Sequence, residues 1–334
     1  MANSQLKIYK SLDAGAPQCY GITGSLLDIL NKCLVTGYGS TTPAGWLKPL
    51  PDTGSYGIFT QPSGSLVSFF INDAGGATTY TSRYANVSGW ETISSIEGGN
   101  VTGSGQFPTA AQQVTSPVPG SLGIAKNSLS SSIANPSSSV SPWIIFADHM
   151  TCYIFILNSV VANIYGGTMF GDIYSYSTAS DSYKAMVIGN HGPIVNNTQE
   201  NFGRPGYVTS ATTGHFLARS YTGAAGGSIV ASKHGDIGKS GIASDLSGKL
   251  AYPNGVDNGI YICPFYVCEV INTNIRGVLR GCWHTPHPAT SFTDGQIITG
   301  TTGDFNGKTF MAVKLIGTND GVCLMETSNT VITN

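Results

Sequence analysis

The most metal-like pattern in the sequence is a cluster of one cysteine and two histidines, Cys282, His284 and His287. Cysteine thiolates and histidine nitrogens are the ligands that zinc prefers in proteins. Two prolines interrupt the segment, so no regular helix or strand aims these side chains, and no fourth ligand follows at a familiar spacing. Cys263 and Cys268 are an odd number of positions apart and would face opposite sides of one strand. We therefore expect a structural loop here, with no metal and no other cofactor.

A short Gly-Lys-Ser run at 238–240 matches the end of a phosphate-binding loop. The first glycine of that motif would fall at the position of Lys233, and no buried strand leads into the run, so we expect an exposed turn. A Ser-His-Asp triad would need an aspartate and a histidine, and the candidates all lie in predicted turns: Asp148, His149, His191 and His234. Nothing in their spacing favours a triad, although one assembled across the fold stays open as an alternative.

Four aspartates lie beside glycines or serines in predicted loops: Asp172, Asp181, Asp294 and Asp304. Asx turns account for such positions without a catalytic carboxylate or a calcium ligand. Exposed tyrosines and tryptophans in these loops would be able to stack on sugar rings, but filling a β-sandwich core is the commoner role of such residues. We assign no catalytic, cofactor-binding or metal-binding residue, and we expect that the protein is not an enzyme.

The composition is unusually poor in charge. Only 10% of the 334 residues are charged, against roughly 25% in ordinary soluble proteins. The net charge is −2, so no basic patch indicates a nucleic acid as partner. A surface of Ser, Thr, Asn and Gly repels copies of itself weakly. It suits a protein that packs against copies of itself or against other subunits.

Targeting and redox signals are also few. No run of eighteen apolar residues occurs, which excludes a membrane-spanning helix, and we expect no membrane insertion. The N-terminus has no basic segment followed by an apolar one, so we expect synthesis in a cytoplasm and departure, if any, by assembly or lysis. The 7 cysteines are scattered and odd in number, and we expect reduced thiols.

The segment 142–188 reads as the centre of the fold. Residues 143–146 and 152–157 are nearly continuous in apolar character. A strand has that pattern only when both of its faces are covered, so we place these two at the centre of a sheet. The four residues from Asp148 to Thr151 between them are short enough for a hairpin connection.

Residues 25–35 form the one convincing helix. Thr23 or Ser25 is placed to cap its N-terminus, and Gly37 supplies the C-terminal position. The apolar residues fall on one stripe: Leu26, Leu27, Leu30, Cys33 and Leu34. Either this stripe plugs the open face of the protein's own sheet, which we favour, or it docks on a neighbouring subunit. In the first case Cys33 is buried, and Cys19 in the preceding loop is the cysteine that we expect to be most exposed and to form any intersubunit disulfide.

The rest of the chain predicts many short strands with Gly-rich turns, which implies a sandwich or a barrel. In the first half we expect strands at 55–60, 66–72, 78–84 and 89–96, a loop at 98–105 and a long exposed loop at 128–139. An interdomain tether is the alternative for 128–139. In the second half we expect strands at 215–221, 227–234, 259–271, 276–283, 296–300, 309–315 and 321–326. Strong turn signals lie at 253–255 and 257–259.

The predicted fold is therefore all-β, a β-sandwich or barrel-like structure with two β-rich halves and one short N-terminal amphipathic helix. We divide it into an N-terminal strand, helix and Gly/Pro-rich connection at 1–50, a first β-rich half at 51–195 and a second at 196–334. The polar segment 190–205 marks the boundary between the halves.

Several motifs resemble those of virion proteins of tailed bacteriophages. In residues 11–49 they are Ser11 to Pro17, Gly24 to Leu27, Cys33 to Gly39 and Pro43 to Trp46; in residues 275–327 and just beyond they are Leu279 to Gly281, Phe292 to Gly295, Asp304 to Phe310 and Met325 to Ser328. The resemblance rests on structural glycines and turns and includes no catalytic motif.

This resemblance implies a structural subunit of the virion, in the tail, baseplate or neck rather than the shell. The implied partners are copies of the same chain and other virion proteins, and the chain would be synthesised in the host cytoplasm. A receptor- or glycan-binding module at the tail tip, which contacts the host surface, is the alternative. A hydrolase that degrades the cell envelope is the third possibility, and the sequence offers no constellation for it.

Overall fold

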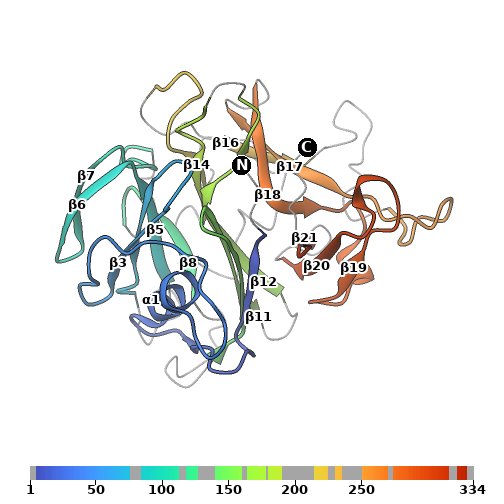
Figure 1. Ribbon diagram of the computed structural model, residues 1–334, viewed down its shortest axis with the longest axis horizontal. Coiled ribbons are helices and arrows are strands. Elements are labelled where there is room, and N and C mark those ends of the chain that lie inside the picture. Colours follow the sequence, from blue (N-terminus) through green and yellow to red (C-terminus); the bar gives the residue numbers. More distant parts are fainter. Residues whose placement is uncertain are drawn as a thin grey trace.

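The computed structural model describes residues 5–75, 84–112, 118–126, 140–159, 164–177, 180–189, 214–224, 230–234, 250–269, 274–315 and 322–328. These residues form mostly antiparallel strands with one short helix near the N-terminus, which confirms the all-β class. A six-stranded, a seven-stranded and a four-stranded sheet make three layers, so the predicted sandwich gains a third layer (Figure 1).

The central layer is a six-stranded sheet that separates two cores. Its order is β1 (Lys7–Lys10), β10 (Trp143–Ala147), β11 (Thr151–Ser159), β12 (Ile164–Asp172), β14 (Ala185–Ile188) and β15 (His215–Leu217). Ile145 and Ile154, paired across β10 and β11, lie in the first core, whereas Phe146 and Phe155 lie in the second. Consecutive apolar residues are needed because both faces are covered, which confirms the predicted central position of these strands.

The first core lies between the central sheet and a layer made of the N-terminal helix and a four-stranded sheet. That sheet has the order β3 (Tyr56–Thr60), β4 (Ser68–Asn72), β5 (Tyr84–Trp90) and β8 (Leu122–Ala125). Phe69 of β4 packs on Phe170 of β12 with ring centroids 5.1 Å apart, and Trp46 contacts both rings. Two small sheets complete this side: β2 (Cys19–Tyr20) with β9 (Val140–Ser141), and β6 (Thr92–Glu97) with β7 (Asn100–Ser104).

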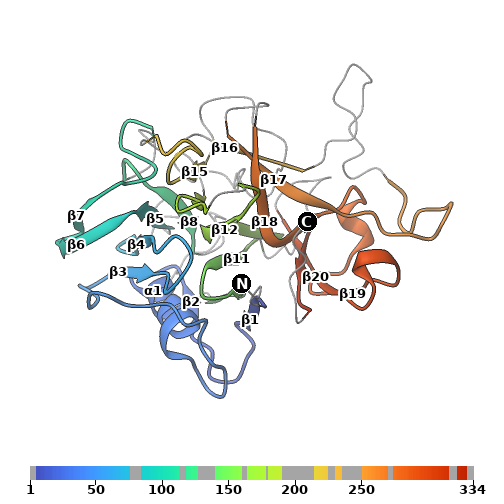
Figure 2. The ribbon, with the colours of Figure 1, turned by 45° about the horizontal axis from the view of Figure 1, so that its top comes forward.

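The second core lies between the central sheet and a seven-stranded C-terminal sheet (Figures 1 and 2). The order of the C-terminal sheet is β16 (Val230–His234), β17 (Cys263–Glu269), β18 (Asn274–His284), β21 (Val322–Glu326), β20 (Thr309–Lys314) and β19 (Ile297–Thr299), and β13 (Tyr174–Ser175) also pairs with β18. Its inner face contributes Phe265, Leu279 and Met325 to the second core. Its outer face carries a smaller cluster around Trp283 and Phe310, beside the short 3-10 helices η3 (Ala289–Ser291) and η4 (Gly303–Phe305).

The predicted helix is present, but its geometry changes half-way. It comprises α1 (Ser25–Leu30) and a π-helical continuation, η1 (Asn31–Thr36), so it ends one residue later than expected. Leu27, Leu30 and Cys33 are buried in the first core. The helix therefore packs within its own chain, which confirms the favoured alternative.

The predicted cap of this helix is wrong. Gly24 is the N-cap residue and provides no side chain, while the Ser25 hydroxyl donates to the carbonyl of Tyr20. The N-terminal amides of Leu26 and Leu27 instead donate to Asp73 Oδ2 at 2.8 and 3.0 Å. A carboxylate from the end of β4 thus supplies the capping acceptor that a local residue normally provides.

Several strand boundaries also differ from the prediction. The expected strand 89–96 is two strands in separate sheets, β5 and β6, and the expected loop 98–105 contains β7. Within the described part of 259–271, residues 259–262 precede the strand, which runs from Cys263 to Glu269. The predicted loop 128–139, most of the predicted strand 78–84, the boundary 190–205 and residues 227–229 lie outside the described residues. Strands from 1–50, 51–195 and 196–334 all take part in the central sheet.

Candidate functional site

A groove among the described residues lies against the outer face of the C-terminal sheet. Its volume is about 440 Å³, within the range of small-ligand sites. One wall is the segment 258–262 before β17, and the other is formed by β19 and the residues that follow it. Ile260, Ile298, Phe305, Phe310 and Leu324 give the groove its apolar surface. The orange loop that leads into the first wall projects from the body of the molecule (Figure 2).

A set of hydrogen bonds fixes the loop at the mouth of this groove. The amide of Asn254 donates to the carbonyl of Gly259, and the amide of Asn258 donates to the carbonyl of Asn254. Asp257 Oδ1 accepts from Asn254 Nδ2 at 2.7 Å and from the amide of Gly259 at 2.9 Å. Asn258 has a φ of 54°, a conformation that asparagine tolerates better than most residues. The turns predicted at 253–255 and 257–259 are therefore confirmed.

Tyr261 is the side chain that this loop presents. Its hydroxyl donates to Asp257 Oδ2 at 2.7 Å, yet 46% of the residue is exposed. The same hydrogen bond, with those from Asn254 and Gly259, lowers the pKa of Asp257 to about 2, and it raises the pKa of Tyr261. An exposed aromatic ring is thus held in place by an ionised carboxylate.

His287 fixes the main chain of Tyr261 from behind. Its Nε2 accepts from the Tyr261 amide at 3.0 Å, and its Nδ1 donates to the carbonyl of Leu250 at 3.1 Å. The Thr285 hydroxyl donates to the carbonyl of Tyr261 at 2.9 Å. Both ring nitrogens of this buried histidine are therefore used in positioning the loop.

The polar groups that line the groove are uncharged. They come from Asn258, Thr299, Thr301 and Thr302, and its described lining includes no Asp, Glu, Lys, Arg or His. An apolar surface, hydroxyl and amide groups and one fixed aromatic ring suit a neutral, partly polar ligand. Sequence reasoning found the turns but did not assemble this site, because its walls are about forty residues apart in the chain.

Cys282 and His284 lie in strand β18, so the loop predicted for this cluster is wrong for these two residues, and they take separate contacts. Cys282 lies beside Cys323 in the second core, whereas His284 packs against Phe265 and lies 3.9 Å from the thiol of Cys263. Across the described residues, no three His, Cys, Asp or Glu side chains are placed to hold one ion.

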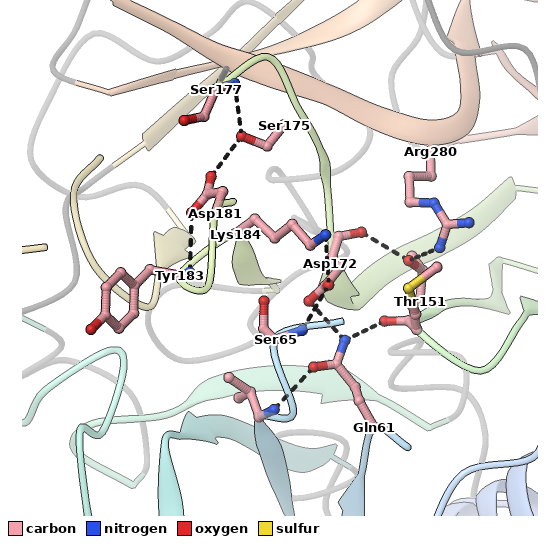
Figure 3. A network of polar contacts seen from close by, with 12 residues as sticks. Gln61, Ser65, Thr151, Asp172, Ser175, Ser177, Asp181, Tyr183, Lys184 and Arg280 are labelled. Atoms are coloured by element: carbon pink, nitrogen blue, oxygen red, sulfur yellow. Dashed lines mark hydrogen bonds and ion pairs between the residues drawn. The ribbon is translucent and has the colours of Figure 1, made fainter. Parts of the chain in front are cut away.

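The predicted loop aspartates are mostly held in buried polar contacts. Asp172 accepts from Gln61 Nε2 at 2.9 Å and from the Ser65 amide at 3.1 Å, and its other neighbour is Lys184 Nζ at 3.6 Å (Figure 3). Burial raises the pKa of Asp172, although the contacts with Gln61 and Lys184 oppose the rise. The backbone carbonyl of Asp172 accepts from the Thr151 hydroxyl at 2.8 Å.

This network continues into the C-terminal sheet. Arg280 Nη1 donates to the Thr151 hydroxyl at 3.2 Å, and Arg280 Nη2 forms a 2.8 Å ion pair with Asp148 (Figure 3 shows the Thr151 contact). Because Gln61, Asp172 and Arg280 come from the three different layers, the network joins all of them. Asp148 therefore takes part in a structural ion pair, and its Oδ1 also accepts from the amides of Met150 and Thr151.

A second buried cluster holds Asp181 and Glu269 around one guanidinium. Arg276 donates to both Asp181 oxygens at 2.7 and 2.6 Å and also to Glu269. Burial opposes ionisation of Asp181, but hydrogen bonds from Arg276 and Ser175 bring its pKa below the ordinary value. Asp294 accepts from the amide of Lys314, and Asp304 lies in η4 at the surface.

The remaining candidates are placed as follows. Cys19 is buried, not exposed as expected, because β2 pairs with β9 and its thiol donates to the carbonyl of Lys126. His149 follows Asp148 in the β10–β11 turn. The run 238–240 and His191 lie outside the described residues, as do the side chains of Lys233 and His234.

Comparisons with known proteins add no assignment: no protein-family model and no curated protein matches this chain. Within the described residues, no helix is both long and apolar enough to cross a membrane.

Proposed function

We propose that this chain is a structural subunit of a tailed-bacteriophage particle, in its tail, baseplate or neck, and that it acts by assembly without catalysis. The observation that carries the proposal is where the charges lie. Eight charged side chains of the described residues are buried, from a chain with only 16 basic and 18 acidic residues. Charged residues are rarely buried, so the surface is poorer in charge than the composition alone implies. Electrostatic repulsion between copies with such a surface is weak, so the copies are able to pack closely.

The experiment measures self-association and location in the particle. We expect light scattering to show oligomers whose mass rises with protein concentration, with little dependence on salt. We also expect antibodies against the purified chain to label one part of intact tailed particles. A monomer at every concentration, together with particles that lack the chain, would refute the proposal.

A corollary concerns catalysis. Because Asp148, Asp172, Asp181 and Glu269 are held in buried ion pairs and hydrogen bonds, we predict no turnover of peptidoglycan, lipopolysaccharide or polysaccharide by the purified protein. Release of reducing sugars or soluble fragments checks this. Turnover that disappears when a single Asp, Glu or His is replaced would contradict it.

A second candidate function is binding of a neutral glycan or receptor in the groove beside Tyr261. The fixed, exposed ring of Tyr261 favours it, because sugar rings stack on aromatic faces and their hydroxyls pair with groups such as Thr299 and Asn258. Titration with neutral disaccharides, followed by NMR, tests it. We expect Tyr261→Ala to abolish the shifts and Tyr221→Ala, which changes a 63% exposed tyrosine outside the groove, to preserve them. Unchanged spectra of the unmodified protein would exclude a neutral disaccharide site.

A further inference from the structure

Two cysteine side chains meet in the second core. Cys282 lies in β18, Cys323 lies in β21, and both are buried. Their Sγ atoms are 2.9 Å apart. This is closer than van der Waals contact between two sulfur atoms and longer than the ~2.05 Å of a disulfide bond.

The pairing of the two strands explains the approach. Cys282 is opposite Met325 and Cys323 is opposite His284, so the two cysteines are diagonal neighbours on the face that points into the core. The right-handed twist of paired strands brings one diagonal closer on each face. Gly281, with a φ of 61°, also bends β18 directly before Cys282.

A third sulfur atom lies nearby, so a metal site has to be weighed against a covalent bond. Cys323 Sγ is 3.6 Å from Met325 Sδ. Two thiolates bound to one tetrahedral zinc ion, each at ~2.3 Å, would lie about 3.8 Å apart. Cys282 and Cys323 are closer than that, which places their sulfur atoms for a bond to each other and not for sharing an ion.

We propose that Cys282 and Cys323 form an intrachain disulfide when the chain meets an oxidant. With a low-molecular-weight disulfide as oxidant, one cysteine thiol exchanges with it to give a mixed disulfide and releases one small thiol. The second cysteine then attacks the protein sulfur and displaces the other small thiol. Two cysteine thiols and one small disulfide become one protein disulfide and two small thiols, so atoms and electrons balance.

The burial of Cys282 and Cys323 limits the conditions under which the disulfide forms. Strand β18 lies between β17 and β21, and β21 lies between β18 and β20, so neither cysteine is at a sheet edge. Burial, with the contact to Cys323, raises the pKa of Cys282 well above its ordinary value, and the attacking species is the thiolate. Oxidation therefore accompanies folding or partial unfolding, and the chain remains reduced while it is in a reducing cytoplasm.

A peptide map tests the bond directly. Protein unfolded in urea is refolded with either oxidised or reduced glutathione, free thiols are blocked with N-ethylmaleimide, and both samples are digested with trypsin. Cleavage after Arg280, Lys308 and Lys314 places Cys282 in peptide 281–308 and Cys323 in peptide 315–334, each without another cysteine. We expect these peptides to be joined only in the oxidised sample and to separate on reduction.

Blocked thiols on both peptides of the oxidised sample would overturn the proposal, as would a link from either peptide to a different cysteine. Protein expressed in an oxidising compartment gives the same readout without refolding. Stoichiometric zinc or copper that is lost on Cys323→Ser would establish a metal site instead.

Thermal unfolding supplies a second readout. The two cysteines are 41 positions apart, and closing such a loop restricts the unfolded chain enough to raise the Tm of the oxidised protein by about 5 °C. We expect this gain to vanish in Cys282→Ser and in Cys323→Ser. It should persist in Cys263→Ser, which changes a partly exposed cysteine of the neighbouring strand β17. A gain that survives Cys282→Ser would contradict the assignment.

Discussion

Asp73 and Lys126 form a fully buried ion pair in which each charge has several partners. Asp73 Oδ1 lies 2.5 Å from Lys126 Nζ, and Asp73 Oδ2 accepts from the amides of Leu26 and Leu27. Lys126 Nζ also donates to the carbonyl of Ile22 at 2.7 Å. Such additional hydrogen bonds are what allows a buried pair to offset the cost of removing two charges from water.

We predict that Asp73→Ala lowers the free energy of unfolding by about 3–5 kcal/mol, because it leaves the Lys126 ammonium buried and the helix amides uncapped. Urea unfolding measures the change. The matched control is Asp28→Ala, which removes an exposed carboxylate from the same helix and should change stability by roughly 0.5 kcal/mol or less. Equal effects of the two substitutions would show that the buried pair does not stabilise the fold.

The Cys19 thiol gives a prediction about pH. Burial raises its pKa from 9.0 to about 12. The folded state therefore holds this proton more tightly than the unfolded state, so the stabilisation is complete below pH 9 and is lost as pH rises toward 12. Between pH 8 and pH 11, the stability difference between wild type and Cys19→Ala should fall by about 3 kcal/mol. A difference that stays constant in urea unfolding at the two pH values would contradict this linkage.

The burial of a single residue could be predicted from the sequence where residues close to it in the chain determine its position in the fold. Cys33 could be placed in the core because it shares a helical stripe with Leu30. Cys19 could not, because the strand β9 that covers it lies more than a hundred residues further along the chain. The same holds for Asp73, whose capping role depends on a contact 46 to 47 positions away.

At the scale of elements, the helix is a structural plug whose stripe faces the first core. We predict that Leu30→Ala costs about 2–5 kcal/mol, because it opens a cavity among buried side chains. Leu12→Ala is the control, since Leu12 is 92% exposed. If Leu30→Ala instead left the isolated subunit fully stable and abolished only assembly, the stripe would have to contact a neighbouring subunit.

The strands that the sequence predicts best are those with strong burial. Strand β10 is apolar at every position, and β11 is apolar from Cys152 to Leu157. The hairpin of β6 and β7 was missed because most of its side chains are exposed or half-buried, so it carries no apolar alternation. The change from α- to π-helix at Asn31 leaves no mark in the apolar stripe and could not be foreseen.

At the scale of the whole molecule, two cores share one sheet. The first core includes Ile145 and the second includes Phe146, which are neighbours in strand β10. Unfolding of either core would therefore expose one face of this strand. We predict one calorimetric unfolding transition for the intact chain, despite its length. Two separate transitions, reproduced by the isolated segments 51–195 and 196–334, would show that the halves fold independently.

The sequence indicated the sheet-rich class and the central strands, but not the layers. Pairing between distant segments sets the layers, as when β15 joins β14 or β13 joins β18. The groove has the same origin, since Tyr261 and Thr299 come together only when β19 joins the C-terminal sheet through β20.

The two-faced central sheet also has a consequence for synthesis. Strand β14 ends at Ile188, but the face that carries Phe146 and Phe155 is covered by strands between Cys263 and Glu326. At ~5–20 residues per second, a ribosome needs on the order of ten seconds or more to complete that cover. During this interval the nascent chain presents an apolar sheet face to its surroundings. We therefore expect the yield of native protein to depend on the rate of translation and on the supply of chaperones.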